Sequence, residues 1–258
     1  MLSLVGLFAP LPTPLTDDGS TISEVRLART IRWLTQQGIA GFIVGTETGQ
    51  STSLSLSERK LLLEIAMREA QGRPVLSNVT AFSTTAALDL AQSAHRHGVR
   101  AVVLAPPPFA VLTEAELYHH YSTIAQHAGT HVIAIDPQGV FTPALIQRLE
   151  NLPMFVQAQP IQGHCCIYPT GTHTDSFSFG DMVVSPMAAI APWLLTPHMA
   201  NCTLQPELAA TGSRRLVSAA LELHGIEVGP LRGPYLSLNT ALTDLLRTFL
   251  EQSRSQAA

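Results

Sequence analysis

At 258 residues the chain is long for one average domain but lies within the size range of a single large α/β domain. Hydrophobic residues make up 46% of it and charged residues 13%, which predicts one large core and a sparsely charged surface of the kind found at oligomer interfaces. The formal net charge of -4 argues against nucleic acid or an anionic membrane as the main partner, because a negative average field attracts neither. A small ligand or a protein is the expected partner.

The first residues and the cysteines bear on where the protein works. Residues 1–14 contain an apolar run without a basic segment before it, and prolines interrupt the run, so we interpret it as a strand rather than a signal peptide. No apolar stretch approaches the roughly 18 residues that cross a bilayer. The three cysteines are too few and too irregular for a disulfide framework. Together these features predict a cytoplasmic protein without a membrane partner.

Strand-like runs alternate with amphipathic helical runs from residue 6 to about residue 159, a pattern typical of parallel strands joined by helical crossovers. Most of the helical runs open on Ser or Thr and close on Gly, which are helix start and stop signals. Strands are expected at residues 6–11, 41–46, 74–80, 101–107, 131–137, 154–159 and 181–186. Helices are expected at 22–38, 55–72, 83–98 and 113–129 and from about residue 143.

The alternation fails after residue 159. Residues 160–180 contain no convincing helix, although a parallel strand pair needs a crossover of roughly a dozen residues. If "HCCIYP", residues 164–169, is the seventh strand, then the sixth helix is missing or this strand is displaced. Helical stretches at 206–225 and 238–254 follow, so C-terminal helices are expected over about 200–254.

Several segments resemble, in order and spacing, the dihydrodipicolinate synthase and N-acetylneuraminate lyase family of class I aldolases. "PTPLTDDGSTIS" (12–23) is similar to the opening motif of that family, "WLTQQGIAGFIV" (33–44) to its second helix and strand, and "SLSLSER" (53–59) to the start of its next helix. The resemblance implies a (β/α)8 TIM barrel, here one domain over 1–258 that is truncated or irregular around strands 6 and 7. It also implies a homo-oligomer, a dimer or tetramer, and pyruvate bound as a Schiff base.

The family motif that holds the pyruvate carboxylate aligns with "TETGQ", Thr46 to Gln50. Thr48 and Gly49 match it. The threonine whose hydroxyl relays a proton in the family is replaced by Glu47, and the closing glutamate by Gln50. The resemblance therefore implies ligand-binding roles for Thr46, Thr48 and Gly49 but changed chemistry at Glu47.

The remaining catalytic positions of the family are degenerate. The tyrosine after the fifth strand aligns with Ala134, and the tyrosine lent across the dimer interface aligns with Phe109. The segment after Pro137 is shorter than in the family and lacks its substrate-binding arginine. A gapless match places the Schiff-base lysine at Gln159, whose amide nitrogen is not nucleophilic. The one lysine in the sequence, Lys60, lies early in an expected helix, where a solvated surface role is predicted.

These residues leave two functions open. A third hypothesis is a decayed protein that has no selected role. The first is a ligand-binding or regulatory pseudoenzyme that has lost Schiff-base aldolase activity. The alternative is a lysine-independent lyase, isomerase or cyclase that acts on a small oxo acid through Glu47, with Thr48, Gln159 or Asp136. Glu47 would lie at the carboxyl end of a barrel strand, where catalytic residues of this fold gather. Equally, Glu47 could bond Thr48 or a nearby loop, and Asp136 could form a turn or cap at Pro137.

No cofactor and no metal site is expected. The sequence "GHCCIYPTGTH" offers possible zinc ligands, but adjacent cysteines do not easily point at one ion; the residues are His164, Cys165, Cys166 and His173. We interpret His119, His120 and the two histidines of "SAHRH" as surface or interface residues, and Trp33 and Trp193 as packing residues.

Overall fold

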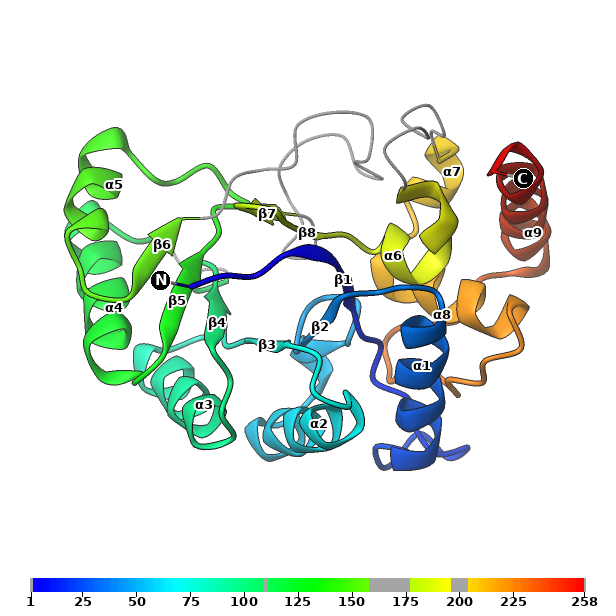
Figure 1. Ribbon diagram of the computed structural model, residues 1–258, viewed down its shortest axis with the longest axis horizontal. Helices are drawn as coiled ribbons and strands as arrows, with labels where there is room; N and C mark the ends of the chain where they lie inside the picture. The colour runs from blue at the N-terminus through cyan, green and yellow to red at the C-terminus, as the bar shows by residue number, and fades with distance from the viewer. Residues whose placement is uncertain (1, 109–110, 158–176, 196–203, 258) are drawn as a thin grey trace.

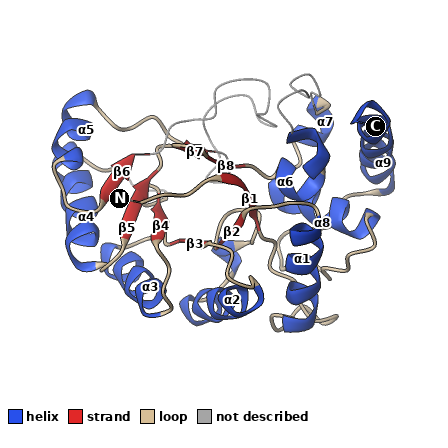
Figure 2. Cartoon of the chain, viewed as in Figure 1, coloured by secondary structure: helices blue, strands red, loops and turns tan. Residues whose placement is uncertain are grey.

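The computed structural model describes residues 2–108, 111–157, 177–195 and 204–257. Its strands form one sheet in the order β6-β5-β4-β3-β2-β1-β8-β7, in which β7 and β8 are antiparallel and the other neighbours are parallel. Figures 1 and 2 show the strands curling around a common centre with helices outside them. The strands are β1 Gly6–Pro10, β2 Gly41–Val44, β3 Val75–Asn78, β4 Ala101–Leu104, β5 His131–Ala134, β6 Phe155–Gln157, β7 Phe177–Phe179 and β8 Met182–Val184.

The first five strands are each followed by a helix, as the sequence predicts. Every one of these helices begins after a Ser or Thr whose side chain accepts a backbone N–H of the first turn. The helix boundaries are therefore set locally by capping residues. The helices are α1 Glu24–Gln36, α2 Leu56–Glu69, α3 Thr84–Arg96, α4 Glu114–His127 and α5 Pro143–Glu150, and a 3₁₀ turn, η1 Ser51–Ser53, precedes α2.

The expected irregularity around strands 6 and 7 is confirmed. Strand β7 is part of a short antiparallel hairpin with β8, with Phe177 opposite Val184, whereas the other neighbouring strands are parallel. The described parts of β6 and β7 are not paired, so the sheet is a nearly closed barrel. The sequence did not predict β7 itself, and the proposed strand at 164–169 lies outside the described residues.

The C-terminal helices are present, with one correction. The helical stretch expected at 206–225 is broken into two helices at Gly212, whose φ of 87° no helical residue adopts. A local turn therefore separates α7 from α8. The elements after β8 are α6 Met187–Ile190, η2 Pro192–Leu195, α7 Pro206–Ala209, α8 Ser213–Leu223 and α9 Thr240–Ala257.

The apolar side chains of the strands alternate between two cores. One core fills the interior of the barrel and includes Phe8, Ile43 and Ile133, and the other lies between the strands and the helices. Phe8 reaches across to β2, where a Cβ on Gly41 would fall 2.3 Å from the Phe8 ring. The interior below the carboxyl ends of the strands is thus a packed core, as in other barrels of this type.

Among the described helices, none is both long and apolar enough to cross a membrane.

Candidate functional site at the carboxyl ends of the strands

The loop after β2 is held tightly at the barrel mouth. A Cβ on Gly49 would lie 2.9 Å from the carbonyl oxygen of Leu11, so only glycine fits without a shift. The hydroxyl of Thr13 donates a hydrogen bond of 2.6 Å to the Gly49 carbonyl. Thr46 and Thr48, predicted to bind ligand, are both buried in this loop. The backbone of this loop is therefore held tightly by its contacts with the loop after β1.

Glu47 points toward α8. Its Oε1 lies 3.6 Å from Nη2 of Arg214, and its side chain is 27% exposed. The Arg214 guanidinium lies 3.7 Å from the centre of the Tyr235 ring, a cation–π contact. The described charged partner of Glu47 is thus an arginine from a distant part of the chain.

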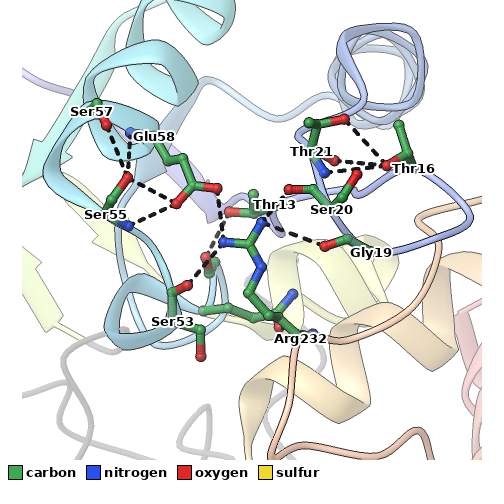
Figure 3. A network of polar contacts seen from close by, with 12 residues as sticks. Thr13, Thr16, Gly19, Ser20, Thr21, Ser53, Ser55, Ser57, Glu58 and Arg232 are labelled. Carbon is green, nitrogen blue, oxygen red and sulfur yellow. Dashed lines mark hydrogen bonds and ion pairs between the residues drawn. The ribbon is translucent and has the colours of Figure 1, made fainter.

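Arg232 joins the C-terminal segment to the loops after β1 and β2 (Figure 3). Its Nη1 lies 2.8 Å from Glu58 Oε1 and donates to the carbonyl of Ser53, and its Nη2 donates to the carbonyl of Ser20. Its backbone N–H donates to Gln50 Oε1 at 2.8 Å, so Gln50 has a structural partner in the C-terminal segment. These contacts hold the mouth in shape.

Arg59 lies beneath the same loop and is buried. It donates to the carbonyl oxygens of Asn78 and Thr80, which follow β3 closely. Burial lowers the pKa of this guanidinium to about 10, so it remains a cation at neutral pH. A fixed positive charge therefore lies behind the loop that carries Thr46 and Glu47.

Asp136 closes a turn. Its two carboxylate oxygens accept the backbone N–H groups of Val140 and Phe141 at 3.0 and 2.8 Å. No hydrogen bond or ion pair in the described parts of the chain joins it to Glu47. The two carboxylates that the sequence suggested as an acid–base pair are engaged with different partners.

Of the three positions that the resemblance marks as degenerate, the structure describes one, Ala134. Ala134 is fully buried in the core that faces the helices, and its neighbours Ile133 and Ile135 fill the barrel interior. Toward the carboxyl end of β5 the side chains that face the interior, Ile133 and Ile135, are therefore aliphatic. Phe109 and Gln159 lie outside the described residues, as do the histidines and cysteines weighed as zinc ligands. The described residues contain no cluster of three or more potential metal ligands.

Lys60 lies in the outer helical layer, as predicted. Its Nζ is 2.6 Å from Asp89 Oδ2, so the pair links α2 to α3 on the outside of the barrel. The lysine side chain is 32% exposed. The one amine-bearing side chain in the sequence is therefore held away from the strands' carboxyl ends.

The interpretation of His120 as a surface residue is wrong, and its place at an interface stays a prediction. The side chain is buried, and its Nδ1 lies 2.8 Å from the Thr84 hydroxyl. It lies beside a hollow of about 500 Å³ between the loops after β3 and β4. Its neighbour His119 is exposed, as are both histidines of "SAHRH". Adjacent helical residues point in different directions, so the sequence could not tell which histidine faces inward.

The two tryptophans pack around a third ring, as predicted. Trp33 stacks on His224 with ring centres 4.9 Å apart, and Trp193 meets the same ring edge-on at 5.4 Å. Sequence reasoning missed Arg214 and Arg232, the two arginines that organise the mouth. Neither belongs to a motif, and no local signal shows that they contact loops more than 150 residues away.

Comparisons with known proteins agree with this architecture. A model of the family described as Dihydrodipicolinate synthetase family matches residues 3–159. An uncharacterized DapA-like lyase of Thermococcus onnurineus is 30% identical over 149 residues, which make up 58% of this chain and 50% of that protein. A 4-hydroxy-tetrahydrodipicolinate synthase of Thiobacillus denitrificans is 32% identical over 252 residues, covering 88% of this chain and 83% of that protein. The chain spans about half the length of most of the curated relatives it matches.

The sialic acid aldolase of Ruminococcus gnavus, solved as the wild type and as a catalytic lysine mutant, has the same fold. Both structures superpose with a TM-score of 0.81 at 18% identity, and the wild type covers 98% of this chain and 99% of that chain.

Proposed function

The chain belongs to the dihydrodipicolinate synthetase family, and from this premise we propose that it is a member that has lost Schiff-base chemistry and serves as a ligand-binding or regulatory protein for a small oxo acid. The observation that carries the proposal is the position of Lys60. A Schiff base needs a primary amine at the barrel mouth, and the only lysine of the sequence is paired with Asp89 in the outer helical layer. The aldolase of Ruminococcus gnavus, in contrast, has a catalytic lysine.

The proposal also draws on the other replaced positions. Gln159 aligns with the lysine, and Ala134 and Phe109 with the two tyrosines, so the amine and both phenols are absent together. The loop from Thr46 to Gly49 is tightly held at the barrel mouth, which supports a ligand site there. Loss of the reacting groups with retention of the loop favours binding without covalent catalysis.

Borohydride trapping tests the proposal. We expect that incubation with pyruvate followed by reduction leaves the mass of the intact chain unchanged, whereas a lysine-dependent aldolase of the family gains the mass of the reduced adduct. Lys60→Arg is the matched control, because it removes the only side-chain amine and should give the same result. A stoichiometric adduct on the wild-type chain would show that the inherited reaction persists.

The alternative is a lysine-independent enzyme that acts through Glu47. One observation favours it: the carboxylate is partly exposed at the carboxyl end of β2. Its place beside the buried Arg214 fixes the direction of the carboxylate in the mouth. Asp136 would take no part, since its oxygens close a turn. A turnover found by screening small oxo acids and abolished by Glu47→Gln would favour this alternative.

We also propose that the protein is a homo-oligomer. Support comes from two large apolar side chains that are exposed near the hollow beside His120: Phe82 at 69% and Val111 fully. Exposed apolar groups of this size are typical of interfaces. Sedimentation velocity should give a dimer or tetramer, and Val111→Ser combined with Phe82→Ser should shift it toward the monomer. A monomeric wild type at micromolar concentration would contradict the proposal.

A further inference from the structure

Arg214 is a buried cation at the barrel mouth with hydrogen-bonding capacity to spare. Its side chain is 9% exposed, and its Nη1 is buried without a hydrogen-bond partner in the described parts of the chain. Its Nη2 is 3.6 Å from Glu47 Oε1, which is an ion pair but too long for a hydrogen bond. Buried guanidinium groups normally have their N–H donors satisfied. The described residues therefore provide no acceptor for the buried Nη1 of Arg214.

Tyr235 holds the guanidinium in a defined plane. The 3.7 Å contact with the ring lies on one face of the guanidinium, so the N–H groups are directed along its edge. A planar edge of parallel N–H donors matches the two oxygens of a carboxylate. The arrangement thus suits a carboxylate better than a spherical anion.

The start of α8 adds positive potential at the same place. Arg214 is the second residue of this eleven-residue helix, and the cap residue Gly212 provides no side-chain acceptor for the first turn. A helix N-terminus carries roughly half a positive charge. A Cβ on Gly212 would lie 3.6 Å from Glu47 Oε1, so the helix terminus and the carboxylate are neighbours. The carboxylate of Glu47 thus lies beside both the Arg214 guanidinium and the N-terminus of α8.

An unsatisfied donor also lies on the loop that carries Glu47. The hydroxyl of Thr46, the preceding residue, is fully buried and has no hydrogen-bond partner in the described parts of the chain. Two buried donors without an acceptor in the described parts of the chain therefore belong to residues next to Glu47: Thr46 along the chain and Arg214 in space.

From these contacts we propose that Arg214, with the first turn of α8, binds the carboxylate of a small oxo acid, and that Glu47 competes for the same guanidinium when the ligand is absent. The inference rests on the proposed function, which supplies the class of ligand. Glu47 is then a charge that weakens binding and is displaced by the ligand carboxylate. Arg214 is the residue that determines the preference for carboxylates.

Isothermal titration calorimetry with pyruvate tests this site by measuring the affinity of the full chain and its variants. Arg214→Gln should weaken pyruvate binding by about tenfold or more, the factor expected for a lost hydrogen bond to a charged group. Glu47→Gln should tighten it by about threefold or more, because a competing negative charge is removed. Arg215→Gln is the matched control. It removes the same charge from the next residue, whose side chain donates to the carbonyls of Thr211 and Leu236 and lies farther from the Tyr235 ring, at 5.7 Å from its centre.

The outcomes separate this inference from the proposed function. Equal pyruvate affinity of the wild type and Arg214→Gln, or no pyruvate binding by the wild type, would overturn the site at Arg214 even if no borohydride adduct forms. An adduct would overturn the proposed function instead. If Arg214→Gln does not melt cooperatively, Arg214→Lys takes its place. It keeps the charge without the planar edge and should still weaken binding, whereas unchanged affinity in Arg214→Lys and in Glu47→Gln would contradict the proposal.

Discussion

Gly41→Ala should destabilise the barrel by about 3 kcal/mol, at the upper end of the cost of overpacking a core. The added methyl group would lie 2.3 Å from Cε1 of Phe8, far inside van der Waals contact. The Phe8 ring is fully buried in the barrel interior and cannot move without displacing the other interior side chains. The φ of Gly41 is not positive, so the cost arises from the contact rather than from backbone strain.

Urea denaturation of a double-mutant cycle measures this contact. Phe8→Leu alone should cost stability through a cavity. The double variant Phe8→Leu/Gly41→Ala should be clearly more stable than the sum of the two single changes allows, because the methyl group then occupies vacated space. Strict additivity would mean that the Phe8 ring does not restrict residue 41.

Acidification from pH 6.5 to about 4 should remove about 3 kcal/mol of stability through His120 alone. Burial, with a smaller effect from the nearby His119, lowers the pKa of His120 from 6.5 to about 4. Below pH 6.5 the unfolded chain takes up a proton on this residue, while the folded protein stays neutral there until about pH 4. The stability contributed by neutral His120 is therefore fully present above pH 6.5 and is lost as the pH falls through this window.

The comparison of variants isolates this contribution, because burial also lowers the pKa of His224. His120→Gln should flatten the dependence of the unfolding free energy on pH between 6.5 and 4. His95→Gln, a change at an exposed histidine, is the control and should leave the dependence as in the wild type. If His120→Gln and the wild type lose stability in parallel over this range, then His120 is protonated in the folded state.

The mouth of this barrel combines a tightly held loop with a pair of opposite charges. The loop after β2 is fixed by the close approach of Gly49 to Leu11 and by the hydrogen bond from the Thr13 hydroxyl. The carboxylate of Glu47 faces a buried arginine, Arg214, which comes from a helix that no motif marks. A negative charge on one side of the mouth is thus matched by a positive charge on the other.

Much of the fold could be predicted from the sequence because its signals are local. Capping residues such as Ser55 and Thr113 mark helix starts, and the alternation of strands and helices implies a parallel sheet. The break in this alternation after residue 159 predicts the irregular part of the barrel. Its form could not be predicted, since a three-residue strand such as β7 depends on pairing with β8 rather than on its own pattern.

The sequence by itself determined that this protein is a barrel whose only lysine is Lys60, because composition and local periodicity are properties of the chain alone. Only the tertiary structure decided that Lys60 pairs with Asp89 outside the barrel, that His120 faces inward, and that Arg214 meets Glu47. The physical reason is distance along the chain. Pairs such as Glu47 and Arg214 are brought together by the packing of whole elements, and no periodicity or motif near either residue records the contact.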